Sequence, residues 1–194
     1  TAVGGYAGYY NVTGVNNTYI GFEAGFGASG QSNSNNTGVG TDALTAITTG
    51  SYNVCIGSRC GDSLTTGHQN VFVGDYAGQA TADVGYAVAV GHGALGSGVV
   101  TNAADGSVAV GSSALAALTS GASNTAVGYQ SGYSITTGND NTLMGTNAGD
   151  AFTDADFNTA VGKNSLTADT LGSRSTAVGW GALQAQNLTT ATNV

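Results

Sequence analysis

The sequence predicts an all-β fold, a parallel β-solenoid (a β-roll or β-helix) of eleven turns of about 17 residues each, and three observations predict it. First, a β-branched residue, a variable residue, then Val, Ile or Met, and finally Gly recur eleven times. Second, the steps between these anchor glycines are 17, 19, 17, 17, 17, 20, 17, 17, 17 and 17 residues. Third, the chain has 33 glycines, no proline and only 7% charged residues, which suits stacked turns. The anchor glycines are Gly4, Gly21, Gly40, Gly57, Gly74, Gly91, Gly111, Gly128, Gly145, Gly162 and Gly179.

The three residues before each anchor glycine are expected to form a strand. Residues three and one before the glycine share one face, because side chains alternate along a strand. Both positions are apolar or β-branched throughout, so we expect this face to be the core of the solenoid. The predicted core residues one before the glycine are Val3, Ile20, Val39, Ile56, Val73, Val90, Val110, Val127, Met144, Val161 and Val178.

The position four before the glycine is predominantly asparagine. Stacked asparagines can hydrogen-bond through their amides along a column, and they suit the corner before a strand. We expect a structural ladder formed by Asn17, Asn36, Asn53, Asn70, Asn124, Asn141 and Asn158.

Each glycine is followed, three residues later, by a small residue and then by Gly or Leu. Several turns then have an apolar residue and a Thr-Thr-Gly corner, as at Thr48-Thr49-Gly50. We therefore expect two short strands and two glycine-rich bends in each turn.

The remaining strand position, two before the glycine, is expected to point outward. It is apolar or small in every turn, so a single chain would expose an apolar stripe along its length. Association of identical chains would cover that stripe, which predicts an intertwined or side-by-side homotrimer. The expected interface residues are Tyr19, Phe72 and Leu143.

The chain is expected to be a single repeat domain, residues 1–194, without capping segments. The two longer steps predict loop insertions near 26–34 and 96–106, and loops of this kind commonly form a contact face. Tyr129 and Trp180 are candidate surface contacts, which could stack on sugars or cover seams between chains.

Charge and composition exclude several classes of function. The formal net charge is −8 and the only cations are Arg59, Lys163 and Arg174, so we expect no nucleic-acid binding. No apolar run is long enough to insert into a membrane. We also expect no catalytic residues, no cofactor and no metal, although a calcium site at Asp150, Asp154 and Asp156 stays open beside the alternative of solvated turns.

Two segments carry a resemblance to known families. The run from Asn124 to Gly138, which starts Asn-Thr-Ala-Val-Gly, resembles the repeats of bacteriophage tail fibres, and Ser107-Val-Ala-Val-Gly111 resembles the head repeats of trimeric autotransporter adhesins. The resemblance covers essentially the whole chain. It implies a trimeric parallel β-roll that builds a stiff, surface-displayed rod which contacts a cell.

We therefore expect a structural fibre or adhesin shaft on a virion or cell surface that supports attachment to a host glycan or protein, with a phage tail fibre favoured. One alternative is an extracellular filament that grows by head-to-tail stacking of subunits. A more remote alternative is ice binding, which would need outward threonines in a regular grid. The expected inward direction of the threonine column argues against it.

Overall fold

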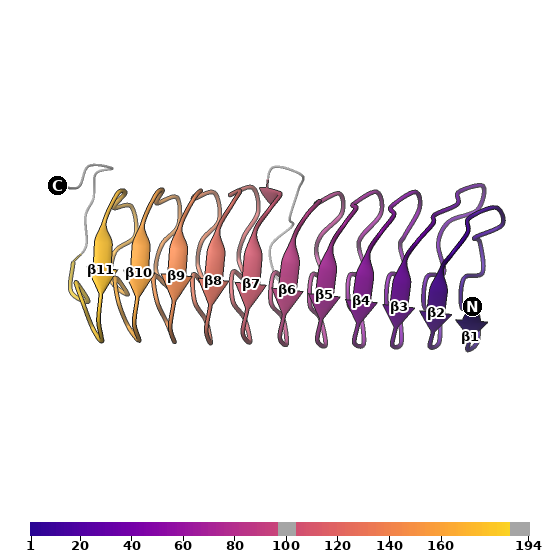
Figure 1. The fold of residues 1–194 in the computed structure, drawn as a ribbon, viewed down its shortest axis with the longest axis horizontal. Coiled ribbons are helices and arrows are strands. Elements are labelled where there is room, and N and C mark those ends of the chain that lie inside the picture. The colour runs from indigo at the N-terminus through magenta and orange to yellow at the C-terminus, as the bar shows by residue number, and fades with distance from the viewer. Residues whose placement is uncertain (97–103, 187–194) are drawn as a thin grey trace.

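The computed structural model describes residues 1–96 and 104–186, which form one sheet of eleven parallel strands in chain order. Each turn brings the chain back to place the next strand beside the last, so the strands follow one another along a rod (Figure 1). The predicted solenoid is confirmed. The strands are β1 (Ala2–Val3), β2 (Thr18–Ile20), β3 (Thr37–Val39), β4 (Val54–Ile56), β5 (Val71–Val73), β6 (Val88–Val90), β7 (Val108–Val110), β8 (Thr125–Val127), β9 (Thr142–Met144), β10 (Thr159–Val161) and β11 (Thr176–Val178).

Equivalent residues of successive turns are register partners throughout the sheet. Thr18 pairs with Thr37 and Val88 with Val108, so the two longer steps leave the register of the strands unchanged. The extra residues of the first insertion lie outside the sheet and are tied to the preceding turn, for example by the bond from Thr13 Oγ1 to Ser32 Oγ at 2.9 Å. Most of the second expected insertion, residues 97–103, lies outside the described part of the chain.

The second strand predicted for each turn is wrong for the described residues, which contain one strand per turn and, elsewhere in the turns, isolated bridges such as that between His68 and Gly85. The residues two and four after Gly40, Asp42 and Leu44, have left-handed backbone conformation (φ 56° at both). A strand requires negative φ at every residue, so these positions form tight turns instead. Backbone bonds to the next turn, such as Leu44 N to Cys60 O at 3.0 Å, still join the turns there.

The strands face the opposite way from the prediction. The middle residue of each strand from β2 to β11 is buried, whereas the residues on either side of it are half-buried or exposed. Val3 is 56% exposed and Val178 is 70% exposed. The predicted core is therefore wrong at each of its positions, Val3, Ile20, Val39, Ile56, Val73, Val90, Val110, Val127, Met144, Val161 and Val178.

The predicted interface residues are likewise interior residues of a single chain. Tyr19 is 2% exposed, and Phe72 and Leu143 are fully buried. The physical reason is the narrow interior, in which the middle column faces the small residues three after each anchor glycine, such as Ala77 and Ala94. Two columns of bulky β-branched side chains could not fit into that space at the packing density of a protein interior.

Residue sizes across this core are complementary from turn to turn. The position four after the anchor glycine has positive φ in every described turn, and it holds Leu only where the middle residues of its own turn and of the next turn are small. It holds Gly beside the large middle residues, because a Cβ on Gly78 would lie 2.4 Å from the ring of Phe72, and one on Gly25 would lie 2.4 Å from the ring of Tyr19. Each large residue thus occupies space that a leucine fills elsewhere.

The anchor glycines allow successive turns to approach closely. At Gly128 φ is 140°, and an added Cβ would lie 2.5 Å from the carbonyl oxygen of Gly145 in the next turn. Both the backbone conformation and the close contact exclude a side chain, which explains why glycine recurs at this position.

The asparagine column forms a buried hydrogen-bonded ladder. Asn141 donates from Nδ2 to Asn124 Oδ1 (2.9 Å) and to the carbonyl of Ala155 (2.7 Å). Its own Oδ1 accepts the backbone N–H and the side-chain N–H of Asn158, both at 3.0 Å. The Asn141 side chain thereby gives hydrogen-bond partners to buried polar groups of the turns before and after it, and so it joins three turns.

Candidate interaction surface

The main feature of the surface is the outer sheet face, which we define as the residues three before (first position) and one before (third position) each anchor glycine. The third-position column contains the residues named above as the predicted core. The first-position column contains Thr1, Thr18, Thr37, Val54, Val71, Val88, Val108, Thr125, Thr142, Thr159 and Thr176.

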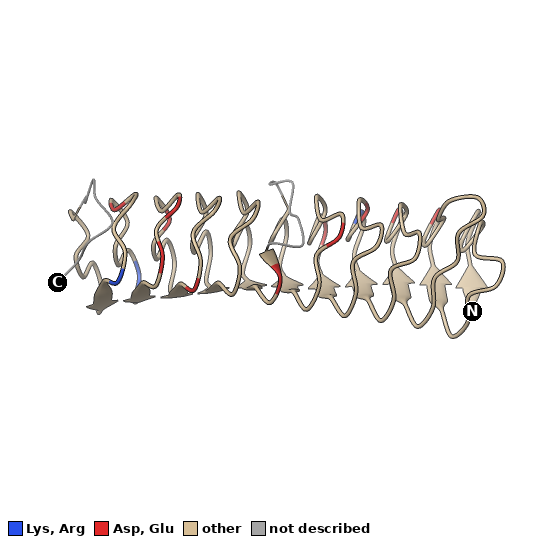
Figure 2. Ribbon diagram, turned by 90° about the horizontal axis from the view of Figure 1, so that it is seen from above, with Lys and Arg blue, Asp and Glu red and all other residues tan. Residues whose placement is uncertain are grey.

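No side chain of the outer sheet face carries a charge. Figure 2 shows the acidic and basic positions on the connecting turns, and none on the described strands. Strand spacing of about 4.8 Å makes the face on the order of 50 Å long, and three residues make it about 10 Å wide. It is a continuous, uncharged strip along one side of the rod.

The apolar side chains of this strip are only partly covered by their neighbours in the column. Ile20 is 40% exposed, Ile56 43% and Met144 45%. Since full burial of such a side chain stabilises by about 1.5–3 kcal/mol, covering the remainder would add about 0.6–1.3 kcal/mol per residue. Contiguous apolar patches of a few hundred Å² often mark interaction sites, so this strip is the candidate interaction surface.

Both candidate contact aromatics lie on the outside of the turns. Tyr129 is 53% exposed and Trp180 is 77% exposed, and each directly follows its anchor glycine. They lie in turns eight and eleven, so the structure does not bring them together.

An aromatic cluster lies in the first two turns. It contains Tyr6, Tyr9, Tyr10, Phe22 and Phe26. Tyr9 stacks on Phe26 at 5.5 Å between ring centres, and Tyr6 meets Phe22 edge-on at 6.1 Å. Aromatic residues five after the anchor glycine in two consecutive turns were the available sequence signal.

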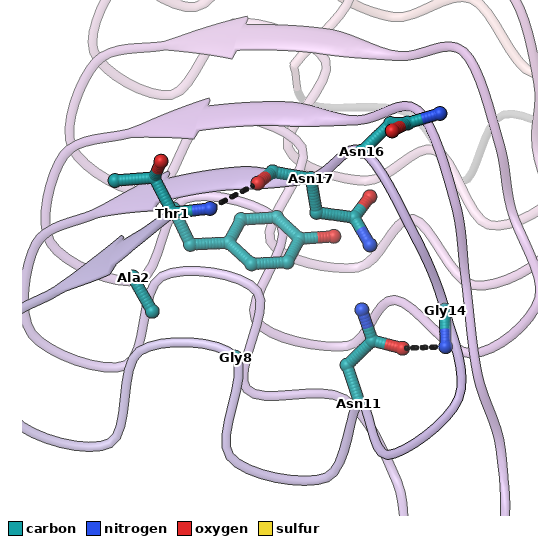
Figure 3. Close-up of a pocket in the computed structure, with 8 residues that line it drawn as sticks. Thr1, Ala2, Gly8, Asn11, Gly14, Asn16 and Asn17 are labelled. Atoms are coloured by element: carbon teal, nitrogen blue, oxygen red, sulfur yellow. Dashed lines mark hydrogen bonds between the residues drawn. The ribbon is translucent and has the colours of Figure 1, made fainter.

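A hollow of about 200 Å³ lies at the first turn, against the buried ring of Tyr19. Its lining includes Asn11, whose Oδ1 accepts the backbone N–H of Gly14, and Asn17, whose carbonyl accepts the N-terminal amine of Thr1 (Figure 3). These polar groups are occupied by bonds within the turn. The lining residues include no acid, base or thiol that could form a catalytic pair.

The three aspartates considered for calcium do not form a site. Asp156 Oδ1 accepts the backbone N–H of Asn139 at 2.7 Å, and Asp154 Oδ1 accepts Thr153 Oγ1 at 3.2 Å. Burial raises the pKa of Asp150, which disfavours the charged form that a cation would need. Within the described residues, no group of three or more His, Cys, Asp or Glu side chains could hold a metal ion.

The two cysteines are packed inside one turn. Cys55 and Cys60 are both free and buried, and Cys60 Sγ donates to the carbonyl of Phe72 at 3.3 Å. Burial raises the pKa of the Cys55 thiol, so this residue is an unreactive part of the core.

Comparison with known proteins leaves the fold as the basis for interpretation. No protein-family model matches the chain, and no curated protein or solved structure is significantly similar to it. The described residues include no helix that could cross a membrane. The structure therefore defines a class, a single-sheet β-solenoid repeat protein with an uncharged outer sheet face.

Proposed function

We propose that the chain is a structural shaft of a homotrimeric fibre, displayed on a virion or cell surface, that supports attachment to a host. The observation that carries this proposal is the outer sheet face, an uncharged strip whose third-position column is apolar in all eleven turns. The resemblance of the repeats to tail-fibre and adhesin repeats supports the same function, and it favours a phage tail fibre.

The proposed copies associate through the outer sheet face, and not through Tyr19, Phe72 and Leu143, which are interior residues. Three such strips meeting along a common axis would cover the exposed Val, Ile and Met side chains. Summed over the strip, their burial would contribute on the order of 10 kcal/mol per chain, against an association cost of about 4–15 kcal/mol. The two magnitudes are comparable, so association requires contact over the whole length, and contact over a few turns does not offset the cost.

The rod supplies stiffness, and exposed residues on its turns supply contacts. Continuous backbone ladders and the buried asparagine column oppose bending of one turn against the next. The aromatic cluster of the first two turns, together with Tyr129 and Trp180, presents rings that can stack on sugars of a host surface.

Electron microscopy combined with mass by light scattering tests this function on the wild-type chain. Discrete rods with three times the 18.9 kDa mass of the chain are expected. Long filaments would favour the alternative of an extracellular polymer, and a folded monomer would contradict the proposed fibre.

Ice binding is a second candidate because the threonine column points outward. The sequence argument against it assumed an inward column, whereas Thr142 and Thr176 are exposed and the column repeats at the strand spacing. Four of its eleven positions are valine, and the third-position column has no threonine, so the grid is incomplete. Thermal hysteresis by a monomeric protein, abolished in the Thr142→Tyr variant, would support ice binding, whereas its absence would remove this candidate.

A further inference from the structure

We propose that four consecutive valines on the outer sheet face, Val54, Val71, Val88 and Val108, set the axial register of neighbouring copies, which pack parallel and with equal turns side by side. This inference rests on the proposed self-association. We call these four residues the valine block. They occupy the first position of β4 to β7. Threonine occupies that position in all the remaining turns.

The valine block divides the first-position column into three parts. Turns one to three hold threonine, turns four to seven valine, and turns eight to eleven threonine. The second insertion falls inside the block, between β6 and β7, yet Val88 and Val108 remain register partners. The pattern on the outer sheet face is therefore continuous even where the repeat length changes.

Opposing copies match best when valine meets valine and threonine meets threonine. Two threonines across an interface can exchange a hydrogen bond, whereas a threonine opposite a valine buries a hydroxyl without a partner. A slip by one turn creates such mismatches at both ends of the valine block. The third-position column is apolar in every turn, so it adds no comparable polar mismatch.

The area of the strip also favours full overlap. At roughly 50 Å by 10 Å its plan area is on the order of 500 Å². A standard interface buries about 800 Å² of accessible surface per partner, which is more than this plan area, so each turn lost to slippage removes contact that the interface needs. An antiparallel copy can also match the valines, but only with an offset that leaves β11 uncovered, although Val178 in that strand is 70% exposed.

Oxidative cross-linking tests the arrangement in a Cys55→Ala, Cys60→Ala background, since alanine fills both positions in most other turns. Two pairs of single-cysteine chains are co-assembled, Val71→Cys with Val88→Cys and Thr18→Cys with Thr142→Cys. Parallel copies in register should cross-link like with like, in at least about tenfold excess over unlike pairs.

Each other pattern of cross-links overturns the proposed arrangement in its own way. Unlike links in both pairs would show antiparallel packing. Unlike links between Val71→Cys and Val88→Cys alone would show a slip of one turn. An associated protein without any cross-link would place the interface elsewhere, whereas a monomer would refute the proposed function itself.

The role of the valine block is tested by replacing all four of its residues. The fourfold Val→Thr variant removes the polar mismatch and leaves only the lost overlap to oppose a slip, so unlike links between Thr159→Cys and Thr176→Cys chains should rise at least about tenfold relative to the unchanged block. The matched fourfold Val→Ile variant keeps the block apolar and should retain like pairs. Unchanged like pairing in the threonine variant, with its trimer mass retained, would show that the block does not set the register.

Discussion

Phe72 and Gly78 test the size complementarity of the core. Phe72 is fully buried, and truncation to Ala removes most of its side chain, which destabilises a protein by about 3–5 kcal/mol. A leucine at Gly78 would start from a Cβ 2.4 Å from the Phe72 ring, so overpacking by about 1–3 kcal/mol is expected. Positive φ at this position, 61°, adds about 1–2 kcal/mol for any residue other than glycine.

The double variant Phe72→Ala, Gly78→Leu should be more stable than the sum of the single changes predicts. It recreates the combination of Ala89 with Leu95 in the next turn, where Leu95 adopts φ 53° and is fully buried. Only the cost of the left-handed leucine and an imperfect fit should remain, about 2–3 kcal/mol. The expected coupling between the two sites is therefore about 3–7 kcal/mol in favour of the double variant.

Urea denaturation followed by circular dichroism measures this coupling at matched protein concentration. The four proteins required are the wild type, both single variants and the double variant. Additive destabilisation would refute the complementarity of the two positions, because independent sites do not rescue each other.

Three further predictions address the ladder, the anchor glycines and a buried tyrosine. Asn141→Ala should destabilise the fold by about 2–4 kcal/mol in urea denaturation, because it leaves the Ala155 carbonyl and the Asn158 N–H without their partner, whereas exposed Thr137→Ala should have little effect. Gly128→Ala should lower the urea midpoint more than Gly179→Ala. Both glycines have positive φ (140° and 127°), but of the two only Gly128 faces a carbonyl oxygen, which would lie 2.5 Å from an added Cβ. Equal losses of stability would show that backbone conformation alone requires glycine. Burial raises the pKa of Tyr19, whose hydroxyl donates to Asn33 Oδ1. The stabilisation by the neutral hydroxyl should therefore be complete below about pH 10 and should decrease at higher pH, where the unfolded chain ionises first. A Tyr19→Phe variant with the same loss of stability at alkaline pH would contradict this prediction.

The architecture could be predicted because the same residues recur at equivalent positions in every turn of the repeat. The anchor glycines and the asparagine column recur at a nearly constant step, and each has one geometric reason, a close approach at Gly128 or a buried amide at Asn141. These signals identify the stacking direction, the strand positions and the parallel order of strands. They also locate the insertions, because register is kept from Thr18 to Thr37 across a longer step.

Hydrophobicity alone could not predict which face of each strand points into the core. Alternation places Thr125 and Val127 on one face and Ala126 on the other, and the larger apolar surface suggested the wrong face as core. The deciding quantity is the space inside the turn, which depends on the left-handed residues after each glycine, such as Leu115 at φ 48°. Non-glycine residues rarely adopt that conformation, so the sequence did not indicate it.

Light scattering and circular dichroism of Val127→Asp and Ala126→Asp test the account most directly. Val127 lies on the outer sheet face, whereas Ala126 is fully buried between Ala109 and Leu143. Val127→Asp should give a folded monomer of 18.9 kDa, because the charge disrupts only the contact between copies. Ala126→Asp should unfold the repeat, since an unpaired buried carboxylate destabilises by several kcal/mol. A trimer of Val127→Asp, or a folded Ala126→Asp beside an unfolded Val127→Asp, would contradict the assignment of the outer face and the core.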